Sequence, residues 1–194
     1  MAITYTNRKQ KTYYLHQGKT KTGKPKYFFS LKAEGTLVDT MPDGYEVYEN
    51  PNARVFLRKI PAKIILDDEI AAIQRGVEQF SQVKHFMIDA KKTVVSIFTP
   101  SQNVERISEL LTSTAAQFGR SQADLDALLE QSLDYTADLR FVLVDKQERL
   151  FQAQRYCYLG RVDDWIDIGG VDGLAVLVER YVGHLGQDSM FELH

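Results

Sequence analysis

Residues 12–31, TYYLHQGKTKTGKPKYFFSL, place a loop rich in glycine and lysine between two short aromatic runs. In each run apolar residues alternate with polar neighbours, which is the period of a half-buried strand. Gly18 and Gly23 bracket the loop, and Pro25 is tolerated only at the edge of a ladder because it has no N–H to donate. The stretch therefore predicts an antiparallel β-hairpin.

The same pattern of strands and turns extends over residues 1–60. Asp43-Gly44 and residues 50–52 are turn sequences, and the residues between and after them are typical of a second hairpin. Ile60-Pro61 is a plausible seam with the rest of the chain. We therefore predict an N-terminal antiparallel β module over residues 1–60.

From residue 67 the apolar period changes from about two to about 3.6, which favours helices. Acidic residues from Asp67 onward suit the positive end of a first helix. A second helix is expected with Thr99 as its N-cap, Pro100 at its first position and Gly119 at its end, and Ser121 caps a third. So short a link predicts an αα-hairpin covering one face of a sheet.

Residues 139–144 are nearly all apolar, and residues 150–159 return after a polar turn with three aromatic residues. A hairpin is also expected at residues 85–98, a third antiparallel strand around Trp165, and a last helix from Leu174. Residues 61–194 thus predict an acidic α+β body of antiparallel hairpins covered by about four helices. The fold class of the whole chain is predicted to be α+β.

Length, cysteine content and apolar runs indicate the class of protein and its expected compartment. The chain has 194 residues, enough for one large domain or two small ones, and a single cysteine, Cys157, which excludes an internal disulfide. The opening residues lack the apolar core of a signal peptide, and no apolar run approaches the length of a membrane helix. We expect a soluble cytoplasmic protein with no membrane partner.

The formal net charge of −2 conceals an asymmetry. Residues 1–34 contain eight lysines and arginines and one glutamate, a net charge of +7, so the remaining residues carry −9. A basic segment on an acidic chain indicates a local anionic partner for the basic segment.

Nucleic acid is the anionic partner that this segment suits best. Lysine and arginine neutralise phosphates, and aromatic faces stack on unpaired bases. A twisted hairpin that carries both can lie in a major groove or follow a single strand. The candidate binding residues are Arg8, Lys9, Lys11, Tyr13, Tyr14, His16, Lys19, Lys21, Lys24, Lys26, Tyr27 and Phe28, with His16 expected to face solvent or phosphate.

A structural interpretation of the same residues stays open. The tyrosines and phenylalanines of a small β unit are also the residues that would form its own core, with the lysines simply solvated.

The segment KTYYLHQGKTKTGKPKYFF resembles the tip of the zinc-ribbon DNA-binding heads of some transposases, where a Gly-Lys-Thr-x-x-Gly-Lys loop precedes an aromatic strand. Those heads hold zinc through cysteines, and this segment contains none, so the resemblance implies DNA binding without a metal. Together with PDGYEVYENPNARVFLRK, the opening also resembles uncharacterised bacterial proteins, which implies a bacterial origin and no activity.

Three other motifs contain residue types that could form a site. Gly18-Lys19-Thr20 is followed by a predicted strand and not by a helix, which argues against a nucleotide phosphate loop. Asp163, Asp164 and Asp167 are hard oxygen ligands, although acids near a strand end are commonly solvated. Cys157 and His184 would form a thiolate pair only if the fold brought them together, and a lone cysteine in a strand is usually a small buried hydrophobe.

The sequence is compatible with three functions. The leading one is a nucleic-acid-binding or nucleic-acid-associated accessory protein. The second is a protein-interaction subunit that binds another protein or a second copy of itself, and the third is a metal-dependent hydrolase using the acids at residues 163–167. We assign no catalytic residue, no metal ligand and no cofactor, and do not expect an enzyme.

Overall fold

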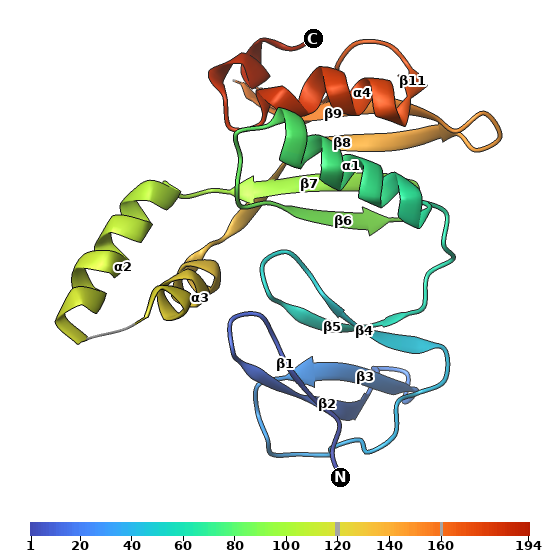
Figure 1. Ribbon diagram of the computed structural model, residues 1–194. Coiled ribbons are helices and arrows are strands. Elements are labelled where there is room, and N and C mark those ends of the chain that lie inside the picture. The colour runs from blue at the N-terminus through green and yellow to red at the C-terminus, as the bar shows by residue number, and fades with distance from the viewer. Residues whose placement is uncertain (119–120, 160) are drawn as a thin grey trace. The chain divides into compact units, whose positions relative to one another are not determined.

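The computed structural model describes residues 1–118, 121–159 and 161–194. In these residues four α-helices accompany eleven strands, and every pairing between strands is antiparallel (Figure 1). The α+β prediction is confirmed. No helix in the described part of the chain is long and apolar enough to cross a membrane.

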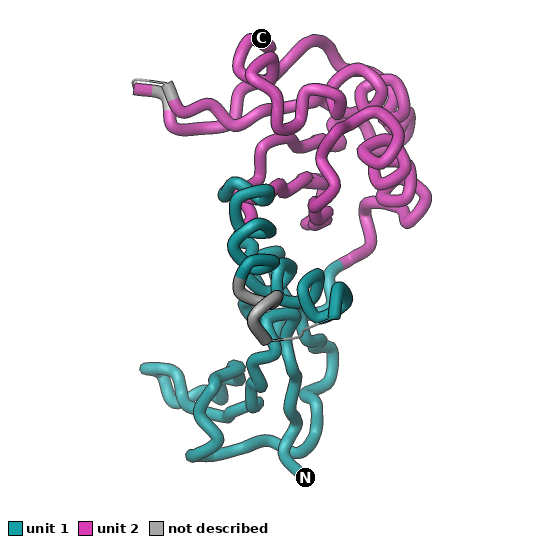
Figure 2. The backbone as a smooth tube through the Cα atoms, turned by 60° about the vertical axis from the view of Figure 1, so that its left-hand side comes forward, with its two compact units in different colours: residues 1–61, 102–134 teal, residues 62–101, 135–194 magenta. Residues whose placement is uncertain are grey.

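The chain separates into two compact units (Figure 2). Unit 1 comprises residues 1–61 and 102–134, and unit 2 comprises residues 62–101 and 135–194. Unit 1 thus combines the N-terminal strands with a helical segment that comes later in the sequence.

Unit 2 is built on an antiparallel sheet with the order β10-β9-β8-β7-β6, and β11 pairs with β9 beside this path. Adjacent strands are also adjacent in sequence, so short turns suffice to connect most of them. The predicted strand around Trp165 is confirmed as β10. The strands are β6 (Met87–Lys91), β7 (Val94–Pro100), β8 (Tyr135–Asp145), β9 (Leu150–Leu159), β10 (Val162–Asp167) and β11 (Asp172–Gly173).

Helices α1 (Asp67–Phe80) and α4 (Leu174–Tyr181) supply the apolar residues that meet one face of this sheet. Alternation along the strands sends every second residue into the core. Gly76 lets α1 approach α4 closely, since a Cβ at residue 76 would lie 2.0 Å from Cγ1 of Val178. The residues of this core that are fully buried include Ile73, Val77, Val95, Ile97, Leu139, Phe141, Phe151, Ala153, Ile168 and Leu177.

The first turn of α1 is tied to the β8–β9 turn by charge. Arg149 donates from Nε to Oε1 of Glu69 over 2.9 Å and from its terminal nitrogen to Oε2 over 2.5 Å. Glu69 also accepts the backbone N–H of Leu66, so one carboxylate caps the helix and binds the guanidinium. The acidic helix start predicted at residue 67 is confirmed. Two short 3₁₀ helices, η1 (Val182–His184) and η2 (Asp188–Glu192), complete unit 2.

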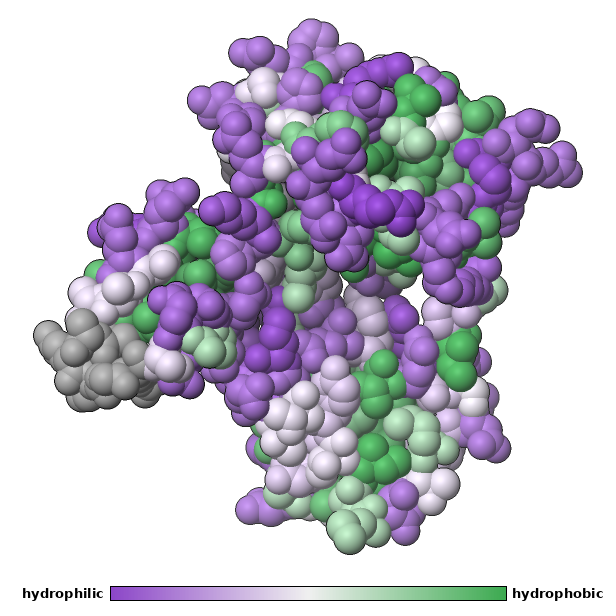
Figure 3. All heavy atoms as spheres, in the orientation of Figure 1, coloured by the Kyte–Doolittle hydropathy of each residue, from purple (hydrophilic) through white to green (hydrophobic). Residues whose placement is uncertain are grey.

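Unit 1 contains a three-stranded sheet, a separate hairpin and a helix pair. Its strands are β1 (Thr4–Thr6), β2 (Thr12–Lys19) and β3 (Pro25–Ser30) in the order β1-β2-β3, the hairpin is β4 (Tyr45–Glu49) with β5 (Val55–Lys59), and the helices are α2 (Val104–Phe118) and α3 (Gln122–Ser132). Both predicted N-terminal hairpins are confirmed. Hydrophobic residues gather over the strands of unit 1 on the face drawn in Figure 3.

The predicted helix pair forms, with two differences. Thr99 is not an N-cap: Thr99 and Pro100 continue β7, where they pair with Thr136 and Tyr135 of β8, and the side chain of Asn103 caps α2 instead. The helices that cover the six-stranded sheet are α1 and α4, whereas α2 and α3 belong to unit 1. Ser121 caps α3 as predicted, and Gly119 lies outside the described residues.

Candidate functional site

The β2–β3 hairpin that was predicted to bind nucleic acid ends in an ordered turn. Its last pairs are Gly18 with Lys26 and Lys19 with Pro25. Within the turn, Thr20 donates its N–H to the carbonyl of Lys24 over 2.8 Å, and its hydroxyl accepts the N–H of Lys24. Gly23 has a φ of 79°, a conformation that favours glycine. The loop is therefore a defined tip held by its own hydrogen bonds.

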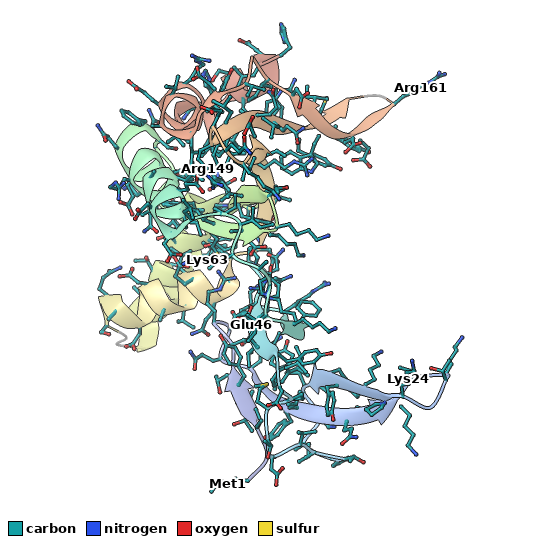
Figure 4. The ribbon with its side chains drawn as sticks, turned by 90° about the vertical axis from the view of Figure 1, so that its right-hand side faces the viewer. Met1, Lys24, Glu46, Lys63, Arg149 and Arg161 are labelled. Atoms are coloured by element: carbon teal, nitrogen blue, oxygen red, sulfur yellow. The ribbon has the colours of Figure 1, made fainter. Side chains whose placement is uncertain are left out.

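Four exposed lysines surround this tip, and Lys24 projects from its end in Figure 4. Paired residues of a hairpin share a face, so Lys19 and Lys26 lie on opposite faces of the ribbon, with the other two in the turn. None of the four forms an ion pair with any described residue. The positive charge therefore encircles the end of the hairpin and does not form one flat surface. The four tip lysines are Lys19, Lys21, Lys24 and Lys26.

Two of the predicted phosphate contacts are occupied within unit 1. The backbone N–H of Arg8 donates to Oε1 of Glu49 over 3.0 Å, and its guanidinium donates to the carbonyl of Pro51. Nζ of Lys9 lies 2.6 Å from Oδ1 of Asp134, and this contact lowers the pKa of the Asp134 carboxyl. These two cations connect the β1–β2 turn to other segments of unit 1.

His16 is the clearest departure from the expected site. Only 6% of its surface is exposed, and its Nε2 lies 2.9 Å from the carbonyl oxygen of Lys32. The expectation that His16 faces solvent was wrong, because the chain after β3 returns over this ring: Leu37 forms a bridge with residue 16, and Gly35 approaches the imidazole.

The aromatic residues of the hairpin differ in how far they are open to a ligand. Phe28 is 41% exposed and stacks on His16, with the ring centroids 5.4 Å apart. Tyr13, Tyr14 and Tyr27 are half-buried. Phe28 is therefore the ring best placed to stack on a base, while the remaining rings also belong to the packing of unit 1. Lys11 is exposed beside them.

The three acidic residues considered as a metal site are bound to other groups. Asp163 accepts a hydrogen bond from the hydroxyl of Tyr156, Asp164 accepts one from the backbone of Trp165, and Asp167 accepts one from Gln154 over 2.7 Å. Alternation along β10 puts Asp164 on the face opposite the other two. Across the described residues, no group of three histidine, cysteine or acidic side chains is arranged to hold a metal ion.

The geometry also does not support a nucleotide phosphate loop at residues 18–20 or a thiolate pair of Cys157 and His184. Gly18 lies in a strand that leads into a second strand, without the helix that a phosphate loop requires. Cys157 is buried opposite Asp164 in the sheet, and Nδ1 of His184 lies 2.8 Å from the hydroxyl of Ser189.

Asp138 is a candidate that sequence reasoning missed. Its carboxyl is partly buried beside Thr99, whose hydroxyl donates to it, and burial raises the pKa of Asp138 above its ordinary value. One signal was available, namely a lone acid just before the apolar residues 139–144.

Comparisons of the chain with protein-family models, with curated proteins and with solved structures found no match. The resemblances that rest on residues 11–29 and 42–59 therefore stay predictions from the sequence.

Proposed function

We propose that unit 1 binds nucleic acid through the tip of the β2–β3 hairpin. The observation that carries this proposal is the set of four tip lysines, all exposed and unpaired among the described residues, on a turn held by its own hydrogen bonds. A lysine without an acidic partner breaks no ion pair when it binds phosphate, whereas the guanidinium of Arg8 would have to leave the carbonyl of Pro51 and Lys9 would have to leave Asp134.

The placement of charge on both faces favours insertion into a groove. A major groove about 12 Å wide admits a two-stranded ribbon and has phosphates along both walls. A ribbon with Lys19 on one face and Lys26 on the other meets both walls, whereas a ribbon lying flat on a backbone would use one face only. Phe28, on the same face as Lys26, is placed for contact with a sugar or base.

A cytoplasmic, bacterial setting is part of this proposal. The one cysteine, Cys157, is buried as a free thiol in β9, which suits a reducing compartment, and the bacterial origin comes from the sequence resemblance alone.

The test is binding of short fluorescent duplex and single-stranded oligonucleotides, measured by anisotropy over a series of salt concentrations. The variant replaces all four tip lysines by glutamine. A matched control replaces Lys59, Lys84, Lys92 and Lys146, which are also exposed, by glutamine. Each phosphate contact adds about 0.9 to the slope of log affinity against log salt for duplex DNA, so the tip variant should lose a slope of about 3 to 4.

The control variant should keep the slope of the wild type. The proposal is wrong if the wild-type protein ignores both oligonucleotides at low salt, or if the control variant loses as much affinity as the tip variant.

A second candidate function is protein interaction through the face of the unit 2 sheet opposite α1 and α4. On this face Cζ of Arg140 lies 4.2 Å from the ring centroid of Trp165, and the ring of Tyr156 meets the same indole edge-on, with the ring centroids 5.5 Å apart. Arginine, tryptophan and tyrosine are the residues enriched in interface hot spots. Sedimentation at low and high salt would test self-association, and an unchanged monomer mass would oppose pairing between copies.

A further inference from the structure

Asp138 occupies an irregular position in the unit 2 sheet. In the β7–β8 ladder, Ile97 pairs with Leu139 but Phe98 pairs with Ala137, so Asp138 is an extra residue on β8. Such a β-bulge changes the direction of a side chain, and bulges occur often beside functional sites. Here the hydroxyl of Thr99, which is buried, donates to Oδ2 of Asp138.

The C-terminal segment forms a pocket beside this carboxyl. Nε of Arg155 donates to the carbonyl of Leu193 over 2.7 Å, and its terminal nitrogen donates to the carbonyl of Phe191 over 3.0 Å. Met190 is buried against the core. The C-terminal segment that lines the pocket is therefore fixed to β9. Its volume is about 240 Å³, and its lining includes Asp138, Tyr156, Gln187, Asp188, Met190 and Phe191.

Burial of the Asp138 carboxyl disfavours its ionised form. Burial raises its pKa, which means that the ionised form is less favourable in the folded protein than in water. Thr99 partly offsets this effect through its hydrogen bond, and no arginine, lysine or histidine in the described residues forms an ion pair with Asp138. A desolvated acid that opens onto a pocket is a candidate for binding a cation.

We propose that this pocket binds a small organic cation, a primary amine or a guanidinium, whose charged group pairs with Asp138. Asp188 adds a second carboxylate, and Met190 with Phe191 provides apolar surface for the rest of the molecule. The volume is below the range of about 300–1,000 Å³ typical of drug-sized ligands, so the ligand is of the size of an amino acid or smaller. The site lies wholly within unit 2 and does not depend on nucleic-acid binding by unit 1.

An organic cation fits the lining better than a metal ion does. Calcium takes six to eight oxygen ligands and magnesium six, with carboxylates prominent among the protein ligands. In the part of the chain that the structure describes, no three histidine, cysteine or acidic side chains come together for a metal. Apolar lining residues are of no use to a bare ion but stabilise the carbon chain of an amine.

The experiment is an NMR titration of the full chain with agmatine, which carries a guanidinium and an amine, beside butylurea as an uncharged analogue. Agmatine should shift the amides of residues around the pocket in a saturable manner, and butylurea should not. Asp138→Asn keeps an oxygen that accepts from Thr99 and should weaken agmatine binding by at least about tenfold, because it removes the buried partner of the cation.

Glu148→Gln is the matched control, since it removes an exposed carboxylate in the β8–β9 turn of the same unit and should change affinity less than twofold. The thermal midpoint of each variant checks that it folds. The proposal is overturned if agmatine does not saturate, if Asp138→Asn binds it like the wild type, or if magnesium or calcium binds at Asp138 and agmatine does not.

Discussion

The two units of this chain are stabilised in different ways. Unit 2 has one continuous apolar core between its sheet and helices α1 and α4. In unit 1, by contrast, only Leu15 and Leu133 appear among the largest fully buried side chains of the described residues. A small core supplies little hydrophobic stabilisation, so polar contacts must contribute a larger share of the stability there.

Those polar contacts connect segments of unit 1 that lie far apart in sequence. Asn7 binds Ala53, Arg8 binds Glu49 and Pro51, and Lys9 binds Asp134. The basic residues of the N-terminal segment therefore have two uses, since the cations at the β1–β2 turn hold unit 1 together while the tip lysines form no ion pair with any described residue. Counting basic residues in the sequence does not separate these two groups.

The largest expected effect comes from Phe141→Ala in the core of unit 2. Phe141 is fully buried, so the lost burial and the cavity should cost about 3–5 kcal/mol of unfolding free energy. Trp165 is the only tryptophan and lies in β10, so its fluorescence during denaturant unfolding reports on unit 2.

The same variant tests whether the two units unfold independently of each other. The backbone amides of β7, β8 and β9 should lose protection against hydrogen exchange, and those of β2 in unit 1 should lose much less. Equal loss of protection in both units would show that they unfold as one cooperative body and would contradict a separate stability for each unit.

A smaller loss is expected from Gly76→Ala in α1. Alanine usually stabilises a helix by about 1 kcal/mol relative to glycine. Here the sign should reverse, because the new Cβ would meet Cγ1 of Val178 at 2.0 Å, and overpacking of this kind costs about 1–3 kcal/mol. Calorimetry should show a lower midpoint for Gly76→Ala and recovery in the double variant with Val178→Ala. A more stable single variant would mean that α1 and α4 are not tightly packed.

The sequence predicted several elements of unit 2 because they have strong local signals. The nearly all-apolar residues 139–144, the aromatic residues of 150–159 and the 3.6-residue period after Asp67 correspond to β8, β9 and α1. It failed where a long-range pairing overrode a local signal: Thr99 and Pro100 read as a helix start, yet the ladder with β8 extends through both residues. Their partners at residues 135 and 136 are far along the chain, so no local rule indicates the pairing.

Some features of the candidate sites were predictable from the sequence and others were not. The exposed lysine tip follows from glycine and lysine between two strands, and its geometry agrees with that pattern. The burial of His16 does not, because it depends on the path of residues 32–37 over the ring. Asp138 was missed for a similar reason, since a bulge is a property of two paired strands and leaves no period in either one.

Asn7→Ala tests the polar contacts of unit 1. Asn7 is buried, its Nδ2 donates to the carbonyl of Ala53 over 2.6 Å, and its Oδ1 accepts the N–H of Lys11 over 2.7 Å. Removing both bonds leaves the buried carbonyl of Ala53 and the N–H of Lys11 without this side chain as a partner and should cost about 1–3 kcal/mol. Exposed Gln17 in β2 offers a control, and Gln17→Ala should change stability by less than about 0.5 kcal/mol. Hydrogen exchange in β2 measures both, and similar losses in the two variants would contradict the role given to Asn7.

The smallest expected effect is a gain in stability from Asp138→Asn, and it depends on pH. Burial raises the pKa of Asp138 in the folded protein, so the folded chain binds this proton more tightly than the unfolded chain does. The stabilisation from protonation is complete below the unfolded pKa of about 3.9 and is lost as the pH rises through the folded pKa. At neutral pH the wild type therefore bears a cost of burying this carboxyl that asparagine does not have. Unfolding followed by Trp165 fluorescence should show Asp138→Asn to be the more stable protein at neutral pH, with the difference shrinking as the solution is acidified. A less stable variant at neutral pH would mean that the carboxylate is well solvated where it stands, and the burial cost that marks it as a binding group would be absent.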